Sequence, residues 1–242
     1  MEMDKSSRQA TTDIGMTTGA IDRPTPASKI QIEQQADGSI AVAIETKRLI
    51  VEPVRHSDAE NYHRHLFGDP QVMEKFATGE VRERAFVDGR INTWVERWKS
   101  GDPFGGFAIR LKSGEFVGHV VLGHGDEPGR SEIAYLIRAD KWGQGYGSEA
   151  VRGVVQGLAP LLRAYGFPVE GGEFKLIDAT ARADNPGSGK ILSNLGMKVI
   201  STSEKFNALR EHYQKEVEGP NSFSRWETLV FGGYKSITTE TF

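Results

Sequence analysis

The chain has 242 residues, which is enough for one well-packed domain with extensions and short for two full domains. Its 30 basic and 33 acidic residues give a net charge of -3, so we predict no nucleic-acid partner. The absence of cysteine excludes disulfides, thiolate metal sites and a covalent acyl-cysteine intermediate, and we predict no metal site. No run reaches the roughly 20 apolar residues that span a bilayer, and no signal peptide is evident. We therefore expect a soluble, cytoplasmic protein without membrane contact.

The N-terminal region precedes the main domain. Residues 1–28 are polar and show no apolar period, which predicts a flexible leader. Residues 29–45 predict a small hairpin, because two strand-like runs flank Asp37 and Gly38, a strong turn signal. We place the main domain at residues 46–235.

The first half of this domain alternates strand and helix patterns. Residues 46–54 predict a strand, and Ser57-Asp58-Ala59-Glu60 is a capping-box start for a helix that runs to about Phe67. Residues 84–99 predict a second helix, because apolar side chains recur there at helical spacing. Three alternating runs with short connections follow, which predicts antiparallel strands at residues 104–111, 115–122 and 131–137.

A glycine-rich motif follows the third of these strands. Residues 142–150 read Trp-Gly-Gln-Gly-Tyr-Gly-Ser-Glu-Ala and lead into an apolar helical run. Alternate glycines can adopt positive φ and let a ligand reach the main chain, while the free amides of the next helix face an anion. The spacing differs from the dinucleotide pattern G-x-G-x-x-G, and the Gly-Lys-Ser/Thr of a Walker loop is absent. We therefore expect a phosphorylated ligand that neither nucleotide motif describes.

The second half of the domain continues this alternation. Pro160 is expected to kink or end the helix that follows the glycines. Residues 175–181 predict a strand, and Asn185-Pro186 starts a helix with an N-cap and a proline in its first position. Gly196 is expected to stop that helix, before a strand at residues 197–202.

The C-terminal region is predicted in three pieces. Residues 206–218 are expected to be helical, and residues 225–231 to form the last strand. Residues 236–242 are expected to be a C-terminal tail.

The Glu-Ile-x-Tyr strand at residues 131–137 and the glycine motif resemble the central motif of the GNAT superfamily of acetyl-CoA-dependent N-acetyltransferases. Within it they look most like the ribosomal-protein N-terminal acetyltransferases. The opening strand and helix and the Asn-Pro-Gly-Ser and Leu-Gly-Met runs are similar to the same group, so the resemblance covers residues 46–202. It implies a mixed α/β (α+β) fold, in which a twisted, mostly antiparallel sheet is splayed to admit acetyl-CoA and carries helices on both faces.

The resemblance also implies how acetyl-CoA is bound. The glycine motif would hold the pyrophosphate through backbone amides, and the edge of the preceding strand would pair with the pantetheine arm. Leu136 and Ile137 would lie on a bulge that faces the thioester carbonyl, with Ile137 as the oxyanion donor. Trp142 stands where many members have Arg or Gln, and it either contacts the ligand or packs over the loop. Asn185 caps its helix, bonds the pantetheine, or does both. The predicted binding residues are Leu136, Ile137, Trp142, Gly143, Gln144, Gly145, Tyr146, Gly147, Ser148 and Asn185.

Acetylation of an amine also needs proton transfer from the amine and to the departing thiolate. Glu132 matches the acidic residue of the group and is predicted to deprotonate the amine through a water or to hold the ammonium. The alternatives are an ordinary strand carboxylate at this position and His119 or His124 as the base. Many members carry a tyrosine acid where this chain has Leu192. Ser188 is therefore our candidate proton donor, although a hydroxyl at this position is also a routine helix cap.

The function that these residues favour is direct acetyl transfer from acetyl-CoA to a primary amine. The resemblance implies a protein or peptide N-terminus as the acceptor. A polyamine, an antibiotic or another small amine is the alternative substrate, and a non-catalytic acyl-CoA-binding regulatory module is the alternative function. The N-terminal hairpin and the C-terminal segment could in addition form a homodimer or partner surface.

Overall fold

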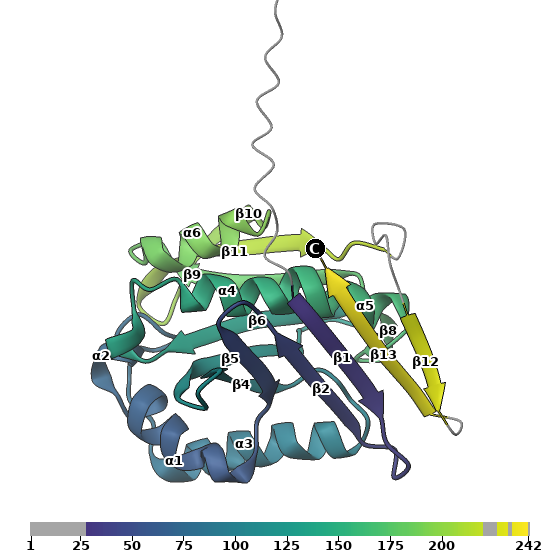
Figure 1. Ribbon diagram of the computed structural model, residues 1–242. Helices are drawn as coiled ribbons and strands as arrows, with labels where there is room; N and C mark the ends of the chain where they lie inside the picture. The colour runs from purple at the N-terminus through teal and green to yellow at the C-terminus, as the bar shows by residue number, and fades with distance from the viewer. Residues whose placement is uncertain (1–27, 220–226, 232–233, 242) are drawn as a thin grey trace, which may run out of the picture.

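The structure is a computed structural model that describes residues 28–219, 227–231 and 234–241 (Figure 1). The predicted leader lies outside the described residues except for Ser28. The strands of the main sheet are β1 (Ser28–Gln34), β2 (Ile40–Glu45), β3 (Leu49–Pro53), β4 (Gly106–Leu111), β5 (Phe116–His124), β6 (Arg130–Ile137), β9 (Leu176–Arg182), β10 (Lys198–Lys205), β11 (Ala208–Glu216), β12 (Glu227–Phe231) and β13 (Tyr234–Thr241). A separate short ladder joins β7 (Pro168–Val169) to β8 (Gly172–Glu173).

The helices surround this sheet. The α-helices are α1 (Ala59–Tyr62), α2 (Pro70–Met73), α3 (Arg84–Lys99), α4 (Tyr146–Arg152), α5 (Ala159–Ala164) and α6 (Pro186–Asn194). The other helical turns are 3-10 in η1 (His56–Asp58) and η3 (Ala139–Lys141), and π-helical in η2 (His63–Phe67) and η4 (Gly153–Leu158). No helix in the described part of the chain is long and apolar enough to cross a membrane.

The sheet has the strand order β10-β11-β9-β6-β5-β4-β3-β2-β1-β13-β12. Every neighbouring pair is antiparallel except β6 and β9, which are parallel. This confirms the expected fold class, a mostly antiparallel mixed sheet with helices. The strands predicted at residues 104–137 are present as β4, β5 and β6, and the helix predicted at residues 84–99 is α3.

Helices cover both faces of the sheet and form two apolar cores (Figure 1). The core under α1 and α3 includes Tyr62, Leu66, Val87, Ile91 and Trp94. The core under α4 and α5 includes Val151, Val154, Val155, Leu158 and Leu162. β6 contributes to both cores, because Leu136 lies in the first and Ile133 in the second, as alternation along a strand requires. Burial of each such side chain contributes about 1.5–3 kcal/mol.

The N-terminal hairpin is confirmed as β1 and β2, which pair from Lys29 and Glu45 to Gln34 and Ile40. β2 also pairs with β3, and β1 pairs with β13. Ile44 is fully buried in the core under α4 and α5. The hairpin therefore extends the main sheet and shares its core.

Two predictions for the C-terminal region are wrong. Residues 206–218 are not helical but contain β11, which is paired on one side with β9 and on the other with β10. The expected tail at residues 236–242 falls mostly in β13, which pairs with β1 and β12. The strand predicted at residues 225–231 is present as β12 but is not the last one.

Two helix predictions also need correction. The first helical segment begins at His56 with Arg55 as its N-cap, and the carboxylate of Asp58, its third residue, accepts a hydrogen bond of 2.9 Å from the Arg55 amide. Pro160 does not end its helix, which continues from α4 through η4 into α5. The π-helical stretch directly before the proline accommodates the missing N–H.

Candidate active site

A cleft of about 1070 Å³ opens where β6 and β9 separate. The two strands pair only from Arg130 and Leu176 to Glu132 and Asp178. Beyond these residues β6 stays paired with β5 as far as Ile137, while its other edge faces the cleft. The sheet is therefore splayed as expected, and the opening is large enough for an extended ligand.

Backbone groups of the odd-numbered residues from 133 to 137 face this cleft. The Arg138 amide donates to the Val117 carbonyl at 3.0 Å, and the Gly125 amide donates to the Arg130 carbonyl at 3.0 Å. The even-numbered residues of β6 therefore exchange hydrogen bonds with β5. Because an antiparallel ladder alternates, the amides and carbonyls of the odd-numbered residues face the opposite way, toward the cleft.

This alternation separates the two residues predicted to face the thioester. The Ile137 amide is directed into the cleft, and its carbonyl accepts a hydrogen bond of 2.7 Å from Trp142 Nε1. The Leu136 amide faces β5, and its side chain is buried in the core under α1 and α3. The expected bulge is absent, because β6 pairs with β5 from Ser131 to Ile137 without a register shift. Trp142 is 46% exposed, so this hydrogen bond, rather than burial, fixes its indole.

The glycine motif forms the connection into α4. Gly143 and Gly145 adopt positive φ of 72° and 79°, as expected, and Gly145 is the N-cap of α4. Gly147 lies in the first helical turn, where an added Cβ would be 3.3 Å from Ile137 Cγ1. A Cβ at Gly143 would meet nothing within 4 Å, so the loop leaves open space beside its main chain. Of the predicted binding residues, all but Gln144 line the cleft.

Arg48 and Glu149 hold this loop in place, a role that the sequence did not indicate. Arg48 Nε lies 2.6 Å from Glu149 Oε2, and Arg48 Nη1 donates to the Gln144 carbonyl at 2.8 Å. The guanidinium also lies over the ring of Tyr146, 4.5 Å from its centroid. Burial alone would raise the pKa of Glu149, but hydrogen bonds from Thr46 and Arg48 outweigh it and lower that pKa. The loop is thus clamped by a charged pair at the base of α4.

Ser188 pairs with Tyr135 across the cleft. The Tyr135 hydroxyl and Ser188 Oγ are 2.8 Å apart, and burial raises the pKa of Tyr135 to about 12. Asn185 caps α6, since its Oδ1 accepts a hydrogen bond of 3.2 Å from the Ser188 amide. Leu192 is fully packed in the core. Tyr135 is thus a tyrosine beside Ser188 that the sequence showed only as part of a strand pattern.

Glu132 lies on the opposite face of the sheet from Tyr135. Glu132 pairs with Asp178 of β9, so the two side chains lie on the same face of the sheet. Thr180 lies on that face too, and it pairs with His212, so β11 continues the same face. The side chain is exposed to the cleft, and partial desolvation by the surrounding protein raises the pKa of Glu132, with a further increase from Asp126. Lys205 lowers that pKa, Asp178 raises it and Arg210 lowers it, in decreasing order of size.

Neither rival histidine lines the cleft. His119 is buried against Tyr62, whose hydroxyl is 3.0 Å from its Nδ1, and burial lowers the pKa of His119 to about 3. His124 lies between two carboxylates, with its Nε2 2.8 Å from Asp102 and its Nδ1 2.5 Å from Glu170. The histidine that does line the cleft is His212, which the sequence did not single out.

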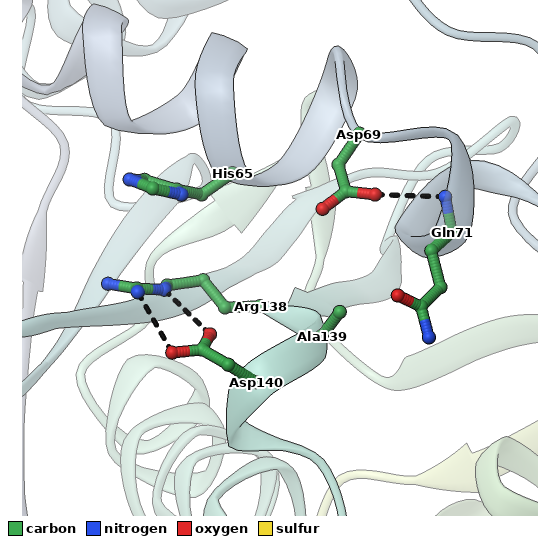
Figure 2. A pocket seen from close by; sticks show the side chains of 6 residues that line it. All are labelled: His65, Asp69, Gln71, Arg138, Ala139 and Asp140. Atoms are coloured by element: carbon green, nitrogen blue, oxygen red, sulfur yellow. Dashed lines mark hydrogen bonds and ion pairs between the residues drawn. The ribbon is translucent and has the colours of Figure 1, made fainter.

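A second pocket of about 400 Å³ lies beside the end of β6 (Figure 2). Arg138 lies across it and makes a two-pronged contact with Asp140, at 3.0 Å from both Nε and Nη2. Asp69 caps α2 and accepts a hydrogen bond of 2.9 Å from the Gln71 amide. Burial, followed by Arg138, lowers the pKa of His65. The acidic groups of this pocket are thus satisfied within it.

Comparison with known proteins identifies the family. A family model described as an acetyltransferase (GNAT) domain matches residues 48–198. An acetyltransferase (GNAT family) from Bacillus anthracis is similar in structure at 19% identity and a TM-score of 0.57, over 72% of this chain and 98% of that one. RimL, a ribosomal L7/L12 α-N-protein acetyltransferase in complex with coenzyme A, matches at 14% identity and a TM-score of 0.57, over 71% of this chain and 95% of that one. A ribosomal-protein-S5-alanine acetyltransferase from Vibrio fischeri matches at 17% identity and a TM-score of 0.57, over 73% of this chain and 97% of that one.

These identities are low, so the structural likenesses show the fold, and they include ribosomal-protein acetyltransferases as the sequence resemblance implied. The family model, in contrast, spans more than half of the chain. The chain therefore belongs to the GNAT acetyltransferases and is an N-acetyltransferase of that family.

Proposed function

We propose that the protein transfers an acetyl group from acetyl-CoA directly to a primary amine, and that the acceptor is the N-terminal amine of a protein or peptide. The observation that carries this proposal is a single cleft that passes through the sheet. Glu132 approaches it from the face covered by α1 and α3, and the Tyr135–Ser188 pair from the face covered by α4 and α6. Two substrates can therefore meet in the gap between β6 and β9.

The residues present fit acetyl-CoA, which would supply the acetyl thioester. The amides around Gly143 and Gly145 form an open, positive-φ connection into a helix, which suits a pyrophosphate. The free edge of β6 offers amides and carbonyls with strand spacing, which suits an arm that contains peptide-like amides. Neither feature depends on a particular side chain. Binding by the main chain explains how Trp142 can occupy a position where many members carry Arg or Gln.

Glu132 would act on the acceptor amine. Its raised pKa makes it a stronger base than an ordinary carboxylate, so it can hold the ammonium and take its proton through a water. An N-terminal amine has a pKa of about 7.7–8.0, against about 10.4 for lysine, so much less assistance is needed to free the former at neutral pH. This difference favours a protein N-terminus, which is also the acceptor type named for RimL.

The other face would serve the thioester. The Ile137 amide lies on the edge of β6 that is not paired with β5, and it would donate to the thioester carbonyl oxygen as negative charge develops on it. The Tyr135 hydroxyl stays protonated at neutral pH because its pKa is about 12, and its hydrogen bond to Ser188 forms a short proton-donating chain. Ser188 would give its proton to the departing thiolate and be reprotonated by Tyr135, which would regain a proton from solvent in the cleft.

The test is thiol release from acetyl-CoA with a panel of peptides, polyamines and aminoglycosides. We expect peptide N-termini to be turned over and Glu132→Gln to lower kcat/KM by about 100-fold or more, within the range of general-base catalysis. Glu127→Gln is the control, because Glu127 is engaged with Arg130 at 2.9 Å, and it should change the rate by less than about twofold.

Other outcomes would redirect the proposal. Turnover of polyamines or aminoglycosides alone would make a small amine the substrate. Tight acetyl-CoA binding without turnover of any amine would favour the non-catalytic regulatory module.

A further inference from the structure

Arg210 is a buried arginine on the wall of the cleft, and it makes no ion pair with an acidic residue in the described part of the chain. Its side chain is 5% exposed, and in the described residues its hydrogen bonds go only to neutral acceptors. Nη1 donates to the Ala77 carbonyl at 3.4 Å and Nη2 to Thr180 Oγ1 at 3.2 Å, while Nε has no partner. These contacts are long, and neither acceptor carries a charge.

Two of the acidic groups nearby are already engaged with other arginines. Asp178 lies 3.3 Å from Arg130, and Asp184 lies 2.9 Å from Arg182. Burial lowers the pKa of Arg210, and the charge of Arg182 acts in the same direction, whereas Glu132 raises it. A buried guanidinium without a counter-charge is unfavourable, so a ligand that supplies one would be bound firmly.

Arg138 provides the internal contrast (Figure 2). It also lines a pocket, but Asp140 takes both of its outward-facing nitrogen atoms at 3.0 Å. Its planar donors are therefore occupied by the protein itself. The donors of Arg210 face a larger opening and have no carboxylate of their own.

Two further charged groups line the same end of the cleft. Lys205 stands at the end of β10, with its Nζ 5.2 Å from the centre of the Phe206 ring and in no ion pair among the described residues. Glu132 lies on the same face of the sheet as Arg210, because β6, β9 and β11 are in register there. Among the described residues, Glu132, Arg210 and Lys205 make no ion pair and line a shared space, where Asp126 and Glu74 are further acidic side chains without an ion pair.

We propose that Arg210 and Lys205 form a carboxylate-binding subsite, so that the preferred acceptor carries an acidic group a few bonds from its reactive amine. The ammonium is held at Glu132, and the carboxylate is held by the guanidinium and the lysine. The carboxylate belongs either to an acidic residue next to a peptide N-terminus or to the α-carboxyl group of a free amino acid. This assignment rests on the proposed function and names the substrate class within it.

The test compares matched acceptors. One arm uses peptides that begin Ser-Asp or Ser-Asn and are otherwise identical, and the other uses a free amino acid and its carboxamide. We expect kcat/KM to be about tenfold or more higher for the acidic member of one arm, as one charge-assisted hydrogen-bonded contact supplies. The arm that shows the preference identifies the source of the carboxylate.

The preference for the acidic acceptor should depend on the guanidinium of Arg210. Arg210→Gln is expected to abolish it, chiefly through KM, while Arg210→Lys retains part of it. Arg182→Gln is the matched control, because Arg182 is paired with Asp184 and does not line the cleft, and it should keep the full preference. If Arg210→Gln fails to fold, Lys205→Gln is used instead. Lys205 is exposed, and its substitution should reduce the preference severalfold.

Failure of this inference and of the proposed function can be told apart. Equal turnover of acidic and neutral acceptors would overturn the subsite and leave the acetyltransferase proposal standing. If no acceptor is turned over, the subsite is tested by binding. The N-acetylated form of each acceptor is titrated into the protein–coenzyme A complex, and its affinity is measured by calorimetry. About tenfold tighter binding of the acidic form that Arg210→Gln removes would support the subsite, and equal or absent binding would overturn it.

Discussion

The two ends of the cleft differ in what they present to a ligand. Around Ile137 and Gly145 the cleft offers backbone groups on a strand edge and a glycine turn. Around Glu132 and Arg210 it offers charged side chains on a continuous face of β6, β9 and β11. A backbone site recognises a constant part of a ligand and tolerates changes of sequence, whereas a side-chain site discriminates between ligands. We infer that the first end serves the common cosubstrate and the second sets the choice of acceptor.

The largest expected effect is a loss of acetyl-CoA affinity when the backbone end of the cleft is disrupted. Gly145→Glu places a side chain at a φ of 79°, with its Cβ about 3.4 Å from Arg48 Nη2, and brings a negative charge to the proposed pyrophosphate site. Backbone strain and repulsion together should weaken acetyl-CoA binding by about 100-fold or more, measured by calorimetry.

Gly166→Glu is the control for this variant. Gly166 has a similar φ of 73°, and its added Cβ meets nothing within 4 Å. It carries the same strain outside the cleft and should lose about 1–2 kcal/mol of stability with acetyl-CoA affinity unchanged. Equal loss of affinity in both variants would mean that the loop does not bind the coenzyme directly.

A smaller effect is expected where the two ends meet. Ser188→Ala and Tyr135→Phe should each lower kcat by about 10- to 100-fold while changing acetyl-CoA affinity little, because the Asn185 cap uses the Ser188 amide and not its hydroxyl. The double variant should be little worse than either single variant, since the two hydroxyls act as one chain. Steady-state kinetics of the three variants checks this, and fully multiplicative effects would contradict it. Ser100→Ala removes an exposed hydroxyl that donates to the Arg97 carbonyl and should leave kcat unchanged.

The smallest effect concerns the clamp behind the loop. Glu149→Gln should reduce the free energy of unfolding at pH 7 by about 1–2 kcal/mol, because it removes a largely buried charge that accepts hydrogen bonds from Thr46 and Arg48. The folded pKa of Glu149 is lowered, so this stability is present above the unfolded pKa of about 4.3 and is lost as the pH falls through the folded value.

Urea denaturation at pH 7 and at successively lower pH measures this difference. The wild type and Glu149→Gln should converge in stability as the solution becomes acidic. Glu96→Gln breaks an exposed pair with Lys99 and should cost no more than about 0.5 kcal/mol at any pH. A wild-type advantage that persists at low pH would mean that the charge of Glu149 is not what stabilises the loop.

The backbone end could be predicted from the sequence because its determinants are local. Gly143 and Gly145 indicate positive φ, and Asn185 followed by Pro186 predicts a capped helix. Each depends on a few consecutive residues whose conformations are restricted by their own chemistry. The resemblance also led to Glu132 and Ser188, and the structure places both on the cleft.

The acceptor end could not be predicted in the same way, because it depends on pairing between distant strands. Residues 206–218 imitate a helix because the apolar residues Leu209, Tyr213 and Val217 recur at helical spacing. In strand β11 the side chains of Arg210 and Tyr213 lie on opposite faces, and that of Tyr213 lies against α6. His119 failed as a candidate base for a related reason, because alternation along a strand does not reveal that Tyr62 closes that face.

The limited pairing of β6 with β9 has a mechanical consequence. Only the pairs from Arg130 and Leu176 to Glu132 and Asp178 join β9, β11 and β10 to the other described strands of the sheet by backbone hydrogen bonds. A ligand arm that hydrogen-bonds along the free edge of β6 fills the gap like a missing strand. If the coenzyme binds there as proposed, it would hold two parts of one molecule together, and amide exchange in β9 would slow on its binding.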